Sequence, residues 1–301
     1  MMTDSDKDNS DLLLAIDGGG TRCRARLARR SGEIIGEGEA GPANLRLGLR
    51  DTFAAVLDAA TQCLAAADLP TAVLSDTTAC LALAGASEPA ELAAARCYRL
   101  PFGQTIVITD AEAACIGAHD GKEGAIIVIG TGSIGWCIVG EQPIRIGGWG
   151  LPVSDEGSGA WLGMEAIRRV LWAHDGRIVW TSLLAEIFAR FEHDPHAIVR
   201  WAATAKPADY GRLAPLVIEH ARRGDIAGSE LALLAAGHID ALAARLVGVG
   251  AQRIALTGGL AVAITPYLAA ETTQYLVTPR GDALAGALRI AAGASATGTA
   301  E

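Results

Sequence analysis

Short apolar runs that lead into glycine recur along the chain and predict buried strands followed by tight turns. The first run covers residues 12–17 and leads into Gly18, Gly19 and Gly20. Residues 22–28 then alternate polar and apolar side chains, as expected for a strand that returns beside the first. The beginning of the chain therefore predicts a β-hairpin with a glycine-rich turn.

A second hairpin is predicted where the apolar run 127–129 enters Gly130-Thr131-Gly132. Together with Gly135, these glycines fit the dinucleotide fingerprint G-x-G-x-x-G, which requires a helix immediately after the glycines. Residues 134–139 are instead rich in β-forming side chains and show no helical period. We therefore interpret the stretch as a hairpin whose glycines let backbone N–H groups approach a phosphate, which disfavours a nicotinamide-dependent dehydrogenase.

A third glycine pair, Gly258-Gly259, ends the apolar run 253–257. Three strand–glycine turns that are widely spaced suggest two similar halves that grip a nucleotide between them. The rest of the pattern predicts strands at 33–38, 77–84, 104–109, 125–146 and 275–277, and helices at 52–67, 88–95, 110–118, 160–173, within 180–248 and at 283–292. Asp51 is expected to cap the first helix and Ser158 the helix that begins at residue 160.

The glycine turns carry motifs that follow one another in a known order. Asp17-Gly18-Gly19-Gly20-Thr21, Gly130-Thr131-Gly132-Ser133 and Thr257-Gly258-Gly259 resemble the phosphate-1, phosphate-2 and adenosine motifs of the actin, sugar kinase and Hsp70 superfamily. Within it, Gly147-Gly148-Trp149-Gly150 and the stretch 155–159 resemble the N-acetylglucosamine/glucosamine kinase branch, which is grouped with the BadF/BadG/BcrA/BcrD ATPases. The resemblance covers residues 12 to about 292.

The resemblance implies an α/β fold with two RNase H-like (actin-like ATPase) domains and a nucleotide- and sugar-binding cleft between them. The expected N-terminal domain comprises residues 12–118 and 281–296. The expected C-terminal domain comprises residues 119–280 and includes a helical insertion. Residues 1–11 are polar and acidic and lack the apolar segment of a signal peptide, so we expect a disordered tail and a cytoplasmic protein.

Composition narrows the classes of partner. The net charge is −9 and the pI about 5.2, which argues against nucleic acid or an anionic membrane, since phosphate backbones recruit basic faces. From the sequence, no apolar run approaches the roughly 18–20 residues of a membrane span. The six cysteines are scattered, without C-x-x-C, and predict small buried side chains rather than a metal or disulfide framework.

Two carboxylates are the main candidates for chemistry. Asp17 ends a buried strand beside a glycine turn and could orient a hydrated Mg²⁺ that bridges nucleotide phosphates, or could simply cap its own turn. Thr21 could bond a phosphate or begin the next strand. Asp110 lies where a predicted strand meets a predicted helix. The resemblance places the catalytic base there, whereas the residue pattern alone also fits a helix N-cap. Thr131 and Gly132 would face the transferred phosphoryl group, where backbone donors stabilise charge.

The sugar-binding candidates lie in two loops. In the kinases that the chain resembles, an Asn at the position of Asn44 contacts the sugar, and an amide suits a vicinal diol because it both donates and accepts. Gly148, Trp149 and Gly150 could bring backbone and an aromatic ring against sugar hydroxyls. Asp155 matches a sugar-binding acid, and its neighbour Glu156 could take the same role.

These motifs and the resemblance together predict an ATP- and Mg²⁺-dependent kinase that phosphorylates the 6-hydroxyl of N-acetylglucosamine or glucosamine. The resemblance also implies that the protein can form a homodimer. An ATPase that activates a CoA dehydratase is a rival from the same superfamily, although it needs cysteines placed for an iron–sulfur cluster. A sugar or nucleotide sensor without catalysis is a further alternative, which dispensability of Asp110 would favour.

Overall fold

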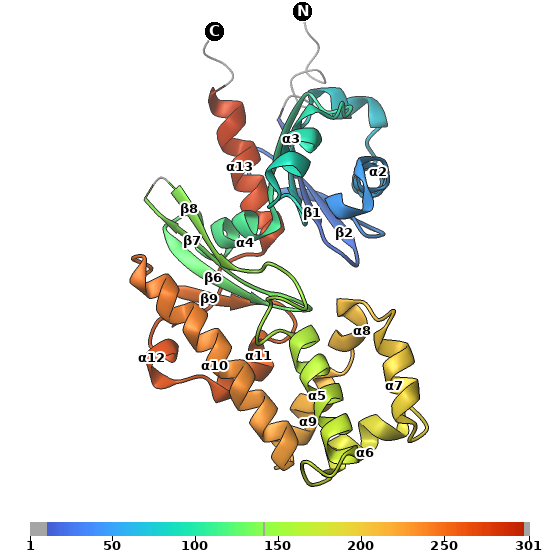
Figure 1. The fold of residues 1–301 in the computed structure, drawn as a ribbon. Coiled ribbons are helices and arrows are strands. Elements are labelled where there is room, and N and C mark those ends of the chain that lie inside the picture. The colour runs from blue at the N-terminus through green and yellow to red at the C-terminus, as the bar shows by residue number, and fades with distance from the viewer. Residues whose placement is uncertain (1–10, 141, 298–301) are drawn as a thin grey trace, which may run out of the picture. The chain divides into compact units, whose positions relative to one another are not determined.

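The structure, a computed structural model, describes residues 11–140 and 142–297, with side chains omitted for residue 142 and residues 295–297. Apart from Asp11, the predicted N-terminal tail therefore lies outside the described residues. The chain divides into two compact units. Unit 1 contains the described residues up to Glu123 and those from Pro279 onward, and unit 2 runs from Gly124 to Thr278. Each unit is built on its own five-stranded sheet (Figure 1).

The sheet of unit 1 has the strand order β3-β2-β1-β4-β5. Its first three strands are antiparallel neighbours, whereas β4 and β5 run parallel to β1. The carboxyl ends of β1, β4 and β5 therefore meet at one edge of the sheet, which is where the candidate residues of this unit are found. The strands are β1 (Leu12–Gly18), β2 (Cys23–Arg29), β3 (Ile34–Ala40), β4 (Thr78–Leu83) and β5 (Gln104–Thr109).

Helices cover both faces of this sheet. Phe53, Val56 and Leu64 of the first long helix belong to the core on one face, and Leu284 of the last helix packs with Leu13 on the other. This packing confirms the expectation that the last helix returns to the N-terminal half. The helices of unit 1 are α2 (Leu49–Ala66), α3 (Pro89–Cys97), α4 (Asp110–Ala118) and α13 (Ala283–Thr297), with short 3-10 turns η1 (Leu45–Leu47) and η2 (Thr71–Asp76).

The sheet of unit 2 has the order β10-β9-β6-β7-β8, with β6, β7 and β8 antiparallel and β9 parallel to β6. The predicted hairpin after residue 129 is confirmed, because β7 pairs with β6 from Ser133 opposite Ile129. The glycines there are thus followed by a strand and not by the helix of a dinucleotide fold. The strands are β6 (Gly124–Ile129), β7 (Ser133–Val139), β8 (Gln142–Gly147), β9 (Ile254–Thr257) and β10 (Leu276–Val277).

Unit 2 is otherwise helical, as the Ala/Leu-rich region predicts. Its helices are α5 (Gly159–His174), α6 (Ser182–Ala189), α7 (Pro195–Ala202), α8 (Pro207–Gly211), α9 (Ala214–Arg222), α10 (Ile226–Gly248), α11 (Ala261–Ile264) and α12 (Ala270–Thr273), with the 3-10 turn η3 (Thr265–Tyr267). By length and composition alone, α10 could cross a membrane, contrary to our expectation from the apolar runs. In this fold Leu231, Ile239 and Leu246 form a buried stripe of α10 that packs into the core of unit 2, as in a core helix of a globular domain.

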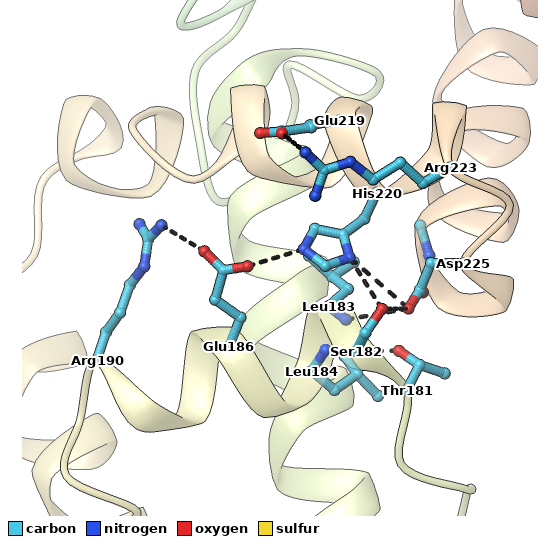
Figure 2. A network of polar contacts seen from close by, with 11 residues as sticks. Thr181, Ser182, Leu183, Leu184, Glu186, Arg190, Glu219, His220, Arg223 and Asp225 are labelled. Atoms are coloured by element: carbon cyan, nitrogen blue, oxygen red, sulfur yellow. Dashed lines mark hydrogen bonds and ion pairs between the residues drawn. The ribbon is translucent and has the colours of Figure 1, made fainter.

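A polar network joins three of these helices (Figure 2). His220 of α9 is buried, and its Nε2 lies 2.9 Å from a carboxylate oxygen of Glu186 on α6. Its Nδ1 lies 3.1 Å from the hydroxyl of Ser182, which donates to Asp225 at 2.8 Å. Asp225 also accepts from the backbone N–H of Leu183 and caps α10 at Gly228. The network therefore ties α6, α9 and the start of α10 together.

One predicted helix start and one possible capping residue need correction. The first long helix begins at Leu49, not residue 52, and its N-cap position is Gly48 rather than Asp51, which lies inside the first turn. The tight η1 turn delivers the chain to Gly48 with φ of +95°, a conformation that glycine allows, so the helix starts earlier. Before α4 the capping side chain is that of Thr109, which accepts from the N–H of Glu112, and Asp110 is the first helical residue. Ser158 caps α5 as predicted.

Candidate functional site

The first glycine turn follows β1 and leaves donors available at its tip. Gly19 N–H donates to Arg22 O at 2.9 Å, which closes the turn. Within the described residues, the N–H groups of Gly20 and Thr21 donate no hydrogen bond, and both residues are exposed. At position 18 glycine is required by packing, because a Cβ there would lie 2.7 Å from Ala43 O. The turn can therefore present backbone donors to an anion.

Asp17 is placed one residue before this turn and is held by an arginine that sequence reasoning did not single out. Arg24 stands opposite Asp17 in the β1–β2 register and donates to its Oδ2 through Nη2 at 2.6 Å and Nε at 3.2 Å. The guanidinium also reaches Asp282 at 3.4 Å. Asp17 is thus fixed on one side, with its other oxygen, Oδ1, outside the Arg24 contacts. The pairing follows from the hairpin register and could have been found from it.

Asp110 begins α4 at the end of β5, on the sheet edge that also carries Asp17. Its side chain is half-buried and its Oδ1 accepts from the N–H of Ala111 at 2.9 Å. Because Thr109 caps the helix, the carboxylate of Asp110 is not the capping group. Nearby, burial raises the pKa of the Glu112 carboxyl, and the charge of Arg96 opposes that shift. Asp110 therefore lies at the strand–helix junction where the resemblance places the catalytic base, and its carboxylate contacts the first turn of α4 without being the N-cap.

Asn44 lies beyond the same edge, because the segment around it adds to the ends of β1 and β4. Asn44 forms a parallel bridge with Ala84, and Ala43 N–H donates to Gly19 O at 3.0 Å. The Oδ1 of Asn44 accepts from Arg46 N–H at 3.0 Å. Its Nδ2 lies 3.9 Å from the Cβ position of Gly20. The structure thus brings the candidate sugar residue of unit 1 beside the first glycine turn.

The second glycine turn, in unit 2, is buttressed by the start of α5. Gly130 N–H donates to Gly132 O at 2.9 Å, and the N–H groups of Gly159 and Ala160 donate to the carbonyls of Gly130 and Thr131 at 2.8 and 3.1 Å. Among the described residues, the N–H groups of Thr131 and Gly132 donate to nothing. The carbonyls of the turn are therefore tied to the helix, while two donors remain for a ligand.

Asp155 lies directly against this turn. A Cβ on Gly132 would be 2.5 Å from Asp155 Oδ2, so only glycine leaves room for the carboxylate. Asp155 Oδ1 accepts from Gly150 N–H at 3.1 Å, which fixes its orientation. Glu156 is exposed, and its backbone carbonyl accepts from the Ser133 hydroxyl at 2.8 Å. Of the two neighbouring acids, Asp155 is the one whose side chain the fold directs at the phosphate-type turn.

The loop 147–150 presents an exposed indole. Trp149 is 64% exposed, and the guanidinium of Arg145 lies over its ring, 4.1 Å from the centroid. Arg145 also donates to the carbonyls of Gly147 and Gly148. Gly148 has φ of +71°, and a Cβ there would lie 2.8 Å from Ile134. Trp149 is therefore held at the surface rather than in the core, and Arg145 supports its loop, a role that sequence reasoning did not predict.

The third turn follows β9 and packs against the end of β6. Gly258 has φ of +93°, and a Cβ there would lie 2.5 Å from Ile129 O. The N–H of Leu260 donates to this same carbonyl at 2.9 Å, so Gly258 and Gly259 lie beside the end of the strand that leads into the second turn. The hydroxyl of Thr257 is buried without a partner among the described residues. It is a polar atom that a ligand could satisfy.

The donor set fits a Mg²⁺ ion that arrives with a nucleotide rather than one caged by protein. Among the described residues there is no group of three or more His, Cys, Asp or Glu side chains arranged to hold a metal. Mg²⁺ keeps several waters and usually binds through one or two carboxylates plus substrate phosphates. Asp17 beside the first turn can supply such a carboxylate. The six cysteines all lie within the described residues; five are buried, none is in a disulfide, and they do not form a ligand set.

Comparisons with known proteins agree with this organisation. The model of the BadF/BadG/BcrA/BcrD ATPase family matches residues 14–291. Glucosamine kinase GspK of Vibrio cholerae is 40% identical over 227 residues, which cover 75% of this chain and 77% of that protein. A crystal structure of a candidate N-acetylglucosamine kinase from Chromobacterium violaceum has 33% identity and a TM-score of 0.87, covering 94% of this chain and 99% of the other.

A more distant structure shares the fold alone. The ROK family glucokinase from Streptomyces griseus, solved with glucose and AMPPNP, is 16% identical with a TM-score of 0.56, covering 95% of this chain and 99% of that one. The two-sheet α/β architecture expected from the sequence is thereby confirmed. Since the family model spans more than nine-tenths of the sequence from β1 to α13, the chain belongs to the BadF/BadG/BcrA/BcrD ATPase family.

Proposed function

We propose that this protein is an ATP-dependent amino-sugar kinase that phosphorylates the 6-hydroxyl of glucosamine or N-acetylglucosamine, with Asp110 as the general base. The observation that carries the proposal is the placement of Asp155 against Gly132, which puts a candidate sugar acid beside a turn with unused phosphate donors. The identity to a glucosamine kinase supports the substrate class. We expect the reaction in the cytoplasm, with a possible homodimer as the working form.

Each residue has a defined task in this proposal. Thr131 and Gly132 donate backbone hydrogen bonds to the transferred phosphoryl group, where charge accumulates. Gly20 and Thr21 donate to the nucleotide phosphates, and Gly258 and Gly259 give the adenosine close access to backbone. Asn44, Gly148, Trp149, Gly150 and Asp155 hold the sugar. Mg²⁺ positioned by Asp17 would neutralise charge on the nucleotide phosphates.

Asp110 takes the proton from the sugar 6-hydroxyl as the new P–O bond forms. Phosphoryl transfer is often loose, so the base can act late, and it also orients the hydroxyl in line with the phosphate. General-base catalysis is typically worth about 10²–10⁴-fold. The half-buried position of Asp110 at the start of α4, on the sheet edge that also carries Asp17, supports this role, and Thr109 rather than Asp110 is the N-cap.

The replacement Asp110→Asn tests this proposal. Turnover of amino sugar, measured by coupled ADP release, should fall by at least about a hundredfold, with KM for the sugar changed much less. Helix α4 should be unaffected, since Thr109 still caps it. Glu123→Gln provides a matched control outside the proposed machinery. Near-normal turnover in Asp110→Asn would place the base elsewhere and would favour Asp155 as the next candidate.

The alternative of a CoA dehydratase activator is less well supported by this chain. That activity needs cysteines that hold an iron–sulfur cluster between subunits. Cys97 alone is exposed among the six, and burial raises the pKa of Cys23, Cys63 and Cys80 to about 12, which disfavours the thiolate that binds iron. Anaerobic reconstitution followed by an iron assay should therefore give no stoichiometric iron.

A further inference from the structure

The guanidinium of Arg24 binds one oxygen of the Asp17 carboxylate and leaves the other outside the contact. Both Nη2, at 2.6 Å, and Nε, at 3.2 Å, donate to Oδ2. Within the described residues, Oδ1 of Asp17 takes part in no hydrogen bond or ion pair. The Arg24 and Asp17 side chains are 30% and 21% exposed, so solvent screens their attraction less than that of a surface pair. Arg24 therefore holds the carboxylate in one orientation.

A second carboxylate fixes Arg24 from its other side. Arg24 Nη1 lies 3.4 Å from Asp282 Oδ2. Asp282 is itself anchored, because its Oδ1 accepts from the N–H of Ala285 at 3.0 Å in the first turn of α13. A planar guanidinium that is bound along two of its edges cannot turn without losing one of these contacts. The orientation of Asp17 is thus tied, through Arg24, to the start of a helix.

Arg26 provides a comparison within the same strand. It lies two residues further along β2, so its side chain is on the same face of the sheet as that of Arg24. Its Nη1 also reaches Asp282, at 3.3 Å, and its Nε donates to Glu37 at 2.8 Å. Among the described residues, its side chain forms no hydrogen bond or ion pair with Asp17. Both arginines therefore connect β2 to Asp282, and the bond to Asp17 is what distinguishes Arg24.

We propose that Arg24 is a positioning residue, which keeps Oδ1 of Asp17 available to the hydrated Mg²⁺ that accompanies the nucleotide. This inference rests on the proposed kinase function and adds a residue that lies outside the three glycine-turn motifs. Mg²⁺ requires near-ideal octahedral geometry and retains several waters, so a carboxylate that is already oriented can meet those waters without first being ordered. Arg24 acts through Asp17 and not on the sugar or the phosphates.

The replacement Arg24→Lys tests the inference, because lysine keeps the positive charge but lacks the planar fork that binds two carboxylates at once. Any effect therefore reports the orientation of Asp17 and not the local charge. We expect turnover of amino sugar at saturating substrate to fall about tenfold, an effect within the range that a misplacement of about 1 Å can have. The Mg²⁺ concentration for half-maximal rate should rise about threefold or more, with KM for the sugar little changed.

Arg26→Lys is the matched control, since Arg26 shares the strand face and the Asp282 contact but not the bond to Asp17. It should change turnover and the Mg²⁺ requirement by less than about twofold. A double-mutant cycle separates positioning from a structural role. In the Asp17→Asn background, Arg24→Lys should lower turnover by less than about a further twofold, because Asp17 no longer carries the effect. A further loss of about tenfold in that background, equal losses in the two lysine variants, or an unaltered Mg²⁺ requirement in Arg24→Lys would overturn the inference.

The proposed function and this inference fail in different ways. If the unmodified protein phosphorylates either sugar and Arg24→Lys behaves like Arg26→Lys, the kinase function stands and the role of Arg24 is wrong. If it phosphorylates neither sugar, the proposed function is wrong, and calorimetric titration with a non-hydrolysable ATP analogue decides the inference. Positioning predicts that Mg²⁺, relative to EDTA, tightens binding of the analogue by a factor at least about threefold smaller in Arg24→Lys than in Arg26→Lys. Equal Mg²⁺ effects in the two variants, or no Mg²⁺ effect in the unmodified protein, would overturn the role of Arg24.

Discussion

The β1–β2 hairpin of unit 1 and the β6–β7 hairpin of unit 2 have the same local design but different surroundings. In each, a buried strand enters a glycine turn, a backbone bond closes the turn, and two N–H groups remain without a partner among the described residues. In unit 1 the carboxylate at the turn is Asp17 of the strand itself, held by Arg24 across the hairpin. In unit 2 it is Asp155, brought in from the loop before α5.

The difference explains why glycine is needed at each turn. Gly18 is confined by backbone and side chains of its own sheet edge, from Ala43 and Leu83. Gly132 is confined by the carboxylate of Asp155, which we propose binds the sugar. Glycine therefore preserves packing in one hairpin and the position of the Asp155 carboxylate in the other. Each hairpin supplies backbone N–H groups that could bind a phosphate. The segment packed beside the turn determines which carboxylate lies next to those N–H groups.

The largest expected effect comes from breaking the contact that is specific to unit 2. In Gly132→Ala the new Cβ would stand 2.5 Å from Asp155 Oδ2, so the carboxylate or the turn must move. We expect kcat/KM for amino sugar to fall by at least about a hundredfold, since misplacement of about 1 Å can have that effect. Coupled ADP release measures it, and urea unfolding checks that the fold persists.

Gly237→Ala is the matched control for that substitution. Gly237 is an exposed glycine of α10 with no atom within 4 Å of its Cβ position. Alanine should raise the free energy of unfolding by about 0.5–1 kcal/mol and leave the activity unchanged. Normal activity in Gly132→Ala would show that the closeness of Asp155 to the turn has no function.

A smaller effect is expected from the corresponding carboxylate of unit 1. Asp17→Asn should lower turnover about tenfold or more and raise the Mg²⁺ concentration required for half-maximal rate, because an amide holds the hydrated ion less well than a carboxylate. Asp51→Asn, at an exposed position of α2, should change neither quantity. A Mg²⁺ dependence that is the same in Asp17→Asn and the unmodified enzyme would remove Asp17 from the metal site.

The polar network of unit 2 should affect stability rather than chemistry. Burial acts to raise the pKa of Asp225, but hydrogen bonds from Leu183, Gly228 and Ser182 outweigh it and hold this pKa below its usual range. A carboxyl whose pKa is lower in the folded state stabilises the fold above its unfolded pKa of about 3.9, and this contribution is lost as the pH falls through the folded value.

Asp225→Ala should therefore lower the free energy of unfolding by about 2 kcal/mol at pH 7, through loss of a helix cap and of bonds to a charged group. The difference from the unmodified protein should shrink below about pH 4, as urea titrations at several pH values would show. Glu230→Gln, at an exposed position of α10, should show no such dependence. A constant difference down to pH 3 would contradict this account of the network.

The smallest effect concerns the cysteines, five of which lie in unit 1 and one in unit 2. Cys97 is exposed, whereas the other five are buried, and burial raises the pKa of Cys23, Cys63 and Cys80 to about 12. A thiol reagent at pH 8 should therefore react quickly with one group per chain and with the rest only on unfolding. Cys97→Ser should lose the fast phase and keep full activity; a persistent fast phase would contradict the burial pattern.

Local features of this protein are determined by the sequence on its own. The strand before each glycine turn, the return strand of each hairpin and the Ser158 cap depend on neighbouring residues, whose hydrogen bonds are satisfied within a few positions. Asp51 is a position at which prediction from neighbouring residues failed. A good capping residue lies one turn inside the helix, because the η1 turn brings the chain into the helix earlier.

Contacts between distant segments were decided only by the tertiary structure. Sequence reasoning selected Asp155 and Gly132 separately, but their contact depends on how the loop before α5 packs against the β6–β7 turn. The burial of the Thr257 hydroxyl gave no signal in the sequence, since a threonine at the end of a strand is ordinary until its oxygen is seen buried without a partner among the described residues. The physical reason is that burial and the lack of a partner are properties of the assembled fold, which no local pattern of residues encodes.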